Sequence, residues 1–113
     1  MTILILAKSE IHVQPRDTDV LVGQLTYLRC STSLGKRILW YHYPVGASES
    51  NYVYLMGLFQ QPYDERFELD THSAAGEFNL VIRSVETSDA GKYVCQEEEE
   101  QGQYRIAELV VLG

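Results

Sequence analysis

The sequence predicts an all-β fold, most economically a sandwich of two antiparallel sheets. Short runs rich in β-branched and aromatic residues recur along the chain, and Gly, Pro, Asp, Asn and Ser separate them. No segment of useful length has the period of a helix, so crossover helices are not expected. A closed barrel is the alternative architecture for this pattern. The 113 residues suit a single domain, 1–113, and the 45% apolar content can form its core.

Nine strands are expected along this chain. Alternation is clearest where Phe78, Leu80 and Ile82 face one side of a sheet and the residues between them face the other. The polar segment Glu86–Gly91 predicts a tight helical turn between two long strands. The expected strands are Ile11–Val13, Val20–Val22, Leu25–Ser31, Ile38–Tyr43, Tyr52–Leu58, Arg66–Asp70, Phe78–Arg83, Lys92–Gln96 and Tyr104–Leu112.

Acidic residues are in excess: 16 against 9 basic ones, which gives a formal net charge of −7. Nucleic acids and anionic membrane surfaces both attract clustered Lys and Arg. We therefore expect no nucleic-acid partner and no direct contact between this domain and a membrane. A neutral or basic protein is the better match.

The two cysteines allow two interpretations on composition alone: a disulfide in an oxidising compartment, or two separate thiols in the cytosol. The apolar start Met1–Ala7 lacks a basic region and is too short for a secretory signal or a membrane span. We expect residues 1–9 to be an added segment or a leader remnant, and the chain to be an excised ectodomain without its signal and anchor.

One constellation is far more specific than composition. Cys30, Trp40 and Cys95 follow one another in that order, and the second cysteine ends the string Asp89-Ala90-Gly91-Lys92-Tyr93-Val94-Cys95. This pattern resembles the signature of the immunoglobulin superfamily. The resemblance implies that Cys30 and Cys95 form a disulfide between the two sheets and that Trp40 packs on it. It also implies that Tyr93 bonds back to the backbone at a corner of the fold.

The resemblance is to variable-type (V-set) domains. The long stretch between the cysteines leaves room, between Leu55 and Arg66, for the extra strand pair of that type. It implies an ion pair between Arg66 and Asp89 across the bottom of the sandwich, and the core signature is then Trp40, Tyr93, Asp89, Arg66 and Gly91. Rearranging antigen receptors carry an aromatic residue followed by Gly-x-Gly in the last strand, and Gly102–Ala107 lacks that motif. The departure favours non-rearranging cell-surface receptors and adhesion molecules.

Strand alternation, together with the sheet arrangement that the resemblance to variable domains implies, predicts an aromatic binding face. If Trp40 points inward, Tyr41 and Tyr43 point outward, and Val94 and Gln96 do the same beside the inward Tyr93. Tyrosine is favoured at interfaces because it buries a large area at little cost in side-chain entropy. The alternative is that some of these tyrosines cover sheet edges or belong to the core. The expected face comprises Tyr41, Tyr43, Tyr52, Tyr54, Val94, Gln96 and Tyr104.

Two charged loops are the second candidate for recognition. The acidic run Glu97, Glu98, Glu99 and Glu100 corresponds to the third hypervariable loop, and Lys36 and Arg37 make the first such loop basic. The acidic run is either a solvated hairpin tip or a loop that steers a basic partner. It could also pair with the basic loop of a second copy in a symmetric dimer.

No residue pattern indicates an enzyme, a metal site or a cofactor. His12, His42 and His72 are too widely spaced for a metal site, and Ser84 and Ser88 lie in no nucleophile motif. We expect an extracellular recognition domain of an immune-type or adhesion receptor, at the cell surface or secreted, that binds a protein or itself. The alternative is a soluble variable-type pattern-recognition protein that binds carbohydrate or a small ligand through its loops.

Overall fold

The computed structural model describes residues 11–33, 37–47, 53–56, 64–71, 76–98 and 102–113. Within them the chain forms ten strands, and a 3₁₀ turn at Thr87–Asp89 confirms the helical turn expected in Glu86–Gly91. The strands are β1 (Ile11–Val13), β2 (Thr18–Leu21), β3 (Thr26–Leu28), β4 (Ser31–Thr32), β5 (Ile38–Pro44), β6 (Val53–Met56), β7 (Phe67–Asp70), β8 (Asn79–Ile82), β9 (Gly91–Glu97) and β10 (Tyr104–Leu112).

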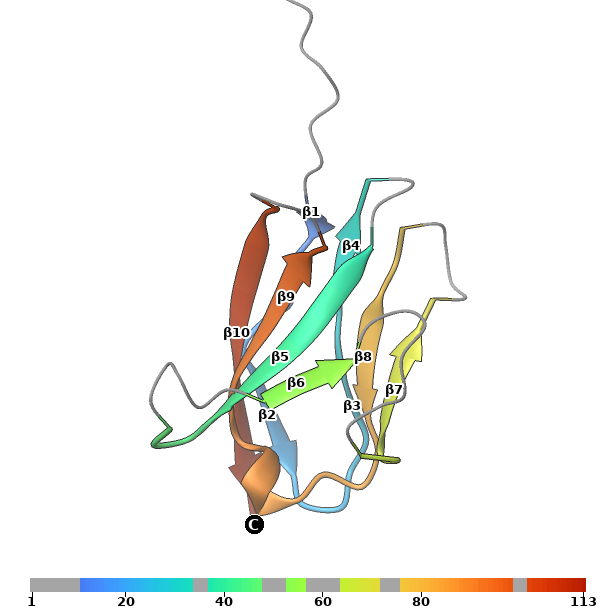
Figure 1. The fold of residues 1–113 in the computed structure, drawn as a ribbon. Helices are drawn as coiled ribbons and strands as arrows, with labels where there is room; N and C mark the ends of the chain where they lie inside the picture. The colour runs from blue at the N-terminus through green and yellow to red at the C-terminus, as the bar shows by residue number, and fades with distance from the viewer. Residues whose placement is uncertain (1–10, 34–36, 48–52, 57–63, 72–75, 99–101) are drawn as a thin grey trace, which may run out of the picture.

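The strands form two packed layers, as Figure 1 shows. One layer is a five-stranded sheet in the order β2-β10-β9-β5-β6, and the other contains the sheet β3-β8-β7, with β1 and β4 as a separate pair. The prediction of a two-sheet β-sandwich is confirmed. The sandwich is not antiparallel throughout, because β2 runs parallel to the end of β10 with Thr18 in register with Leu109.

Most strand predictions hold to within two residues, but Leu25–Ser31 is not one strand. It divides into β3 and β4 because the amide of Cys30 donates to the side-chain Oδ1 of Asn79, at 3.1 Å, instead of to a backbone carbonyl. At this break the chain leaves the pairing with β8 and joins β1, where Thr32 lies in register with Ile11. Tyr52 and the end of the predicted strand Tyr52–Leu58 lie outside the described residues.

The core is centred on the disulfide between Cys30 and Cys95, whose Cα atoms are 6.6 Å apart. Trp40 lies next to Cys95 across the β5–β9 ladder and is fully buried. Its indole Nε1 donates to the carbonyl of Phe78 at 2.9 Å, so the buried polar atom has a partner. Other fully buried side chains from both layers are Leu28, Ile38, Leu80, Ile82, Val85, Tyr93 and Leu109.

Arg66 and Asp89 pair at the lower end of the sandwich, as the family resemblance implied. Arg66 donates from both terminal nitrogens to the two carboxylate oxygens of Asp89, at 2.7 and 2.9 Å, and its Nε lies 2.8 Å from Glu86. The hydrogen bond to Asp89 raises the pKa of Arg66. Burial alone would raise the pKa of Asp89, but the bonds from Arg66 and from the Glu86 amide outweigh it, so that pKa lies below its usual value.

Tyr93 fixes the corner beside this ion pair. Its hydroxyl donates to the carbonyl of Asp89 at 2.6 Å, and its ring stacks on His42 with centroids 4.3 Å apart. Burial raises the pKa of Tyr93. Burial likewise lowers the pKa of His42, against a smaller opposing effect of the hydrogen bond between its Nε2 and the carbonyl of Ala90. These contacts hold β5 and β9 together directly beneath the exposed face of the sheet.

Gly91, the last member of the predicted signature, permits a close approach of the same two strands. Its φ is +133°, and a Cβ atom there would lie 2.3 Å from the carbonyl oxygen of Tyr43. Only glycine avoids both the backbone strain and this clash. β9 can therefore start its pairing with β5 at Pro44 and carry it in register to Ile38.

Candidate recognition surface

The five-stranded sheet turns one side of β5, β9 and β10 away from the core, and we call this side the outer face. The inward side chains of these strands are buried, so alternation sends their neighbours outward. The ladder register aligns the outward residues in three rows across the strands. The rows are Leu39, Gln96 and Tyr104; Tyr41, Val94 and Ile106; and Tyr43, Lys92 and Glu108.

Large apolar side chains on the outer face are in contact with solvent. Tyr104 is 57% exposed and Ile106 51%, whereas Val94 between the neighbouring strands is only 8% exposed. Tyr41 and Tyr43 are half-buried. An exposed aromatic and aliphatic cluster around a buried valine is typical of a protein interaction surface.

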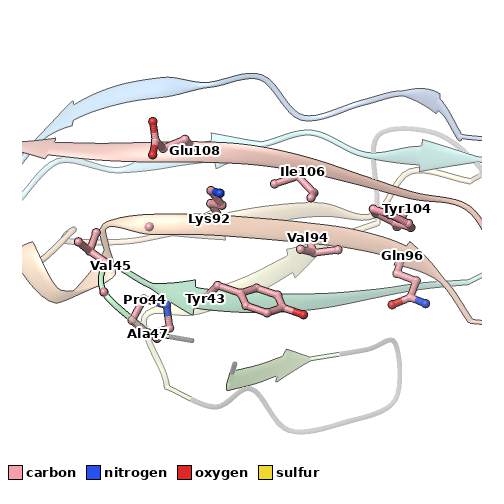
Figure 2. Close-up of a pocket in the computed structure, with 12 residues that line it drawn as sticks. Tyr43, Pro44, Val45, Ala47, Lys92, Val94, Gln96, Tyr104, Ile106 and Glu108 are labelled. Carbon is pink, nitrogen blue, oxygen red and sulfur yellow. The ribbon is translucent and has the colours of Figure 1, made fainter. Parts of the chain in front are cut away.

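The outer face is hollowed along β9, as Figure 2 shows. The side chains of Val94, Gln96, Tyr104 and Ile106 line one part of the hollow, and the turn Pro44–Ala47 closes its other end. That turn is held by a hydrogen bond from the Ala47 amide to the Pro44 carbonyl at 3.0 Å. The hollow is open along its length, a shape that suits a protein surface better than an enclosed small ligand.

The predicted binding face and the observed outer face overlap in five residues. Tyr41, Tyr43, Val94, Gln96 and Tyr104 all lie on the outer face. Tyr54 lies on β6 in Cα register with Tyr41, and Tyr52 is outside the described residues. Their part in binding stays a prediction.

Four residues of the outer face were not predicted: Leu39, Ile106, Lys92 and Glu108. Alternation could have found Ile106 and Glu108, because both share the outward side of β10 with Tyr104. Lys92 alternates in the same way with the inward Tyr93. The signal was present, but on β10 the prediction included only the aromatic residue Tyr104.

The prediction that Glu97 belongs to an exposed acidic loop is wrong. Glu97 is the last residue of β9 and is 1% exposed. Its carboxylate accepts hydrogen bonds from the hydroxyl of Thr32 and, at 3.0 Å, from the amide of Gln103. These two donors replace water, so the side chain is an internal brace of the β9–β10 hairpin.

Two other residues of the predicted charged loops, Arg37 and Glu98, form an ion pair with each other. Arg37 lies 3.4 Å from the carboxylate of Glu98 in the same chain, and its carbonyl accepts from the Glu98 amide at 2.8 Å. This pair is formed within one copy, so it does not need the acidic loop of a second copy. Lys36, Glu99 and Glu100 lie outside the described residues.

The described residues hold no group of three or more His, Cys, Asp or Glu side chains that could bind a metal ion. In the same part of the chain, no helix has the length and apolar character needed to cross a membrane.

Comparisons with known proteins agree with this geometry. The model of the immunoglobulin V-set domain matches residues 13–112. The chain is 30% identical over 90 residues to the Ig kappa chain V region 120 of Oryctolagus cuniculus, covering 77% of this chain and 81% of that relative. It is also 30% identical over 87 residues to the V region 3368 of the same species, covering 74% and 76%. This chain therefore belongs to the immunoglobulin V-set family, whose members are typically extracellular or secreted recognition domains without enzymatic activity.

Solved structures of low sequence identity share the fold. The crystal structure of the RIG-5 IG1 homodimer has a TM-score of 0.78 at 23% identity, over 95% of this chain and 100% of that chain. The crystal structure of Dpr1 IG1 bound to DIP-eta IG1 has a TM-score of 0.79 at 15% identity, over 96% and 100%. At these identities the likeness shows the fold alone.

Proposed function

We propose that this domain is the recognition module of a cell-surface or secreted immune-type or adhesion protein, and that it binds a protein through its outer face. The observation that carries the proposal is the exposure of Tyr104 and Ile106 around the buried Val94. Burying two such side chains against a partner contributes about 1.5–3 kcal/mol each. Interfaces gain most of their affinity from a few anchors of this kind.

The solved relatives support a protein partner over a small ligand. RIG-5 IG1 is a homodimer, and Dpr1 IG1 is bound to another immunoglobulin domain. The open shape of the hollow points the same way, because carbohydrate and small-ligand sites enclose most of their ligand. Among the described residues that line the hollow, Lys92 is the single basic one, which also supports a protein partner over nucleic acid or a membrane.

The test uses the chain's own matched control. Tyr104 is 57% exposed on β10, and Tyr27 is 55% exposed on β3 in the opposite sheet. A tetramerised form of the domain is screened against cells that each display one extracellular protein, and the domain alone is followed by sedimentation. Binding to a displayed protein or to itself should fall at least about tenfold on Tyr104→Ala or Ile106→Asp and stay unchanged on Tyr27→Ala.

Two outcomes would reject the proposal. Binding that survives both substitutions on β10 would place the contact elsewhere on the domain. Binding lost equally on Tyr104→Ala and Tyr27→Ala, in variants with unchanged urea midpoints, would show that the contact is not specific to the outer face. The urea midpoints should stay unchanged because the three substituted side chains are exposed.

A further inference from the structure

The outward residues of β9 and β10 form three complementary pairs. The ladder register places Tyr104 opposite Gln96, Ile106 opposite Val94, and Glu108 opposite Lys92. The first pair joins a phenol and an amide, the second joins two aliphatic groups, and the third joins a carboxylate and an ammonium group. Figure 2 shows these side chains along the two neighbouring strands.

The charges of this face are balanced, unlike those of the whole chain. The residues that line the hollow include one cation, Lys92, and one anion, Glu108, in a chain of formal net charge −7. The described residues contain no ion pair between these two groups, although they face each other across the ladder. Both groups are exposed and remain available to a partner.

A two-fold axis that runs along the strands between β9 and β10 would exchange the two strands. Each residue would then meet the partner of its own row: Lys92 the second copy's Glu108, Val94 the second copy's Ile106, and Gln96 the second copy's Tyr104. The three contacts between β9 of one copy and β10 of the other are all chemically matched under this one operation. An axis perpendicular to the strands would instead bring the charged row of one copy onto the neutral row of the other.

We propose that the protein bound by the outer face is a second copy of this chain, in a dimer held by two crossed ion pairs between Lys92 and Glu108. This inference rests on the proposed function and adds the partner, the axis and the residues that set its register. Between two packed sheets the ion pairs lose water and gain strength over an exposed pair. Repulsion between two chains of charge −7 does not oppose the dimer strongly, because salt screens exposed charges beyond about 8 Å.

Two charge reversals test the pairing. Lys92→Glu leaves two carboxylates at positions 92 and 108 of each copy, and Glu108→Lys leaves two ammonium groups there. Either variant alone introduces two like-charge contacts into the dimer and should raise its dissociation constant at least about 100-fold. Mixed together, the two variants restore both crossed pairs. Their heterodimer should form with a dissociation constant within about tenfold of the wild-type homodimer.

The chain supplies a control of equal charge change. Arg83 and Glu68 form an exposed ion pair on the opposite sheet, so Arg83→Glu and Glu68→Lys change the net charge by the same amounts away from the outer face. Both controls should dimerise like the wild type. Sedimentation equilibrium gives the homodimer constants, and native mass spectrometry of the mixture gives the heterodimer fraction.

The outcomes separate this inference from the proposed function. A wild-type domain that stays monomeric at about 1 mM overturns the dimer, yet the proposed function stands if Ile106→Asp still abolishes binding to a displayed protein. A dimer that Ile106→Asp dissociates, but whose two charge variants form no heterodimer, keeps the outer face and overturns the crossed register. A heterodimer at the expected strength supports both.

Discussion

Arg66 is the single residue with the largest electrostatic role in the described chain. It binds both oxygens of Asp89, a residue that is only 3% exposed, and it also contacts Asp64 and Glu86. Arg66→Ala would leave the Asp89 carboxylate buried without its cation, which costs about 3 kcal/mol of the free energy of unfolding. Urea denaturation measures the loss.

Arg83 provides the matched control for Arg66. Its ion pair with Glu68 is exposed on both sides, so water replaces the partner when the arginine is removed. Arg83→Ala should leave the urea midpoint where it is. Equal losses for the two alanine variants would mean that the Asp89 pair is no stronger than a surface pair.

His42 makes the domain sensitive to mild acid. Burial lowers its pKa in the folded state from the ordinary 6.5, so the unfolded chain takes up more proton than the folded chain as the pH falls through that value. The neutral side chain therefore contributes its full stability above pH 6.5 and loses part of it below, by at most about 1.4 kcal/mol per pH unit. The lowered pKa of Asp89 acts only in stronger acid, below its ordinary value of 3.8.

The test compares the wild type with His42→Gln, whose amide can still donate to the carbonyl of Ala90. The free energy of unfolding of the wild type should fall more steeply than that of the variant between about pH 7 and about pH 5. Parallel curves would show that His42 is protonated equally in both states.

Among the structural elements, the β9–β10 hairpin is stabilised by the buried carboxylate of Glu97, which the sequence did not predict. Glu97 accepts from Thr32 on β4 and from the Gln103 amide, and Gln103 in turn accepts from the amide of Ile11 on β1 at 3.0 Å. Glu97→Ala removes the acceptor for one buried donor, the Thr32 hydroxyl, and one part-buried donor, the Gln103 amide, which costs about 2 kcal/mol. Hydrogen exchange at the Gln103 amide should accelerate, because its bond to the carboxylate is lost.

Glu98 is the neighbouring control, since its side chain is exposed and forms an exposed ion pair with Arg37. Glu98→Ala should change neither the stability nor the exchange rate at Gln103. Comparable effects of the two variants would mean that the net charge of the acidic segment, and not the hydrogen bonds of Glu97, stabilises the hairpin.

The structural elements that depend on neighbouring residues in the sequence were predicted correctly. The boundaries of β10 and the turn at Thr87–Asp89 follow from alternation and turn residues close by in the sequence. The break between β3 and β4 depends on Asn79, which is 49 residues from Cys30, and the burial of Glu97 depends on Thr32, which is 65 residues away. Such long-range donors and acceptors leave no local signature, and a run of four glutamates suggested exposure.

For the molecule as a whole, the outer face was partly predictable for the same reason. Alternation around Trp40 and Tyr93 placed Tyr41, Tyr43 and Gln96 outward. It could not show that neighbours reduce Val94 to 8% exposure, because that depends on how the sheet strands pack side by side. The family signature supplied the layer contacts that alternation lacks, above all the disulfide between the sheets.

That disulfide links the two layers over 65 residues of sequence, from Cys30 at the break between β3 and β4 to Cys95 in β9. A closed loop of this length restricts the unfolded chain by about 4 kcal/mol in the entropic model, a large part of the 5–15 kcal/mol typical of a small domain. Reduction, or the pair of substitutions Cys30→Ala and Cys95→Ala, should therefore lower the free energy of unfolding by about this amount. Urea denaturation with and without reductant measures the change. A loss below about 1 kcal/mol would mean that the buried contacts of Trp40, Leu28 and Ile38 hold the two sheets together without help from the bridge.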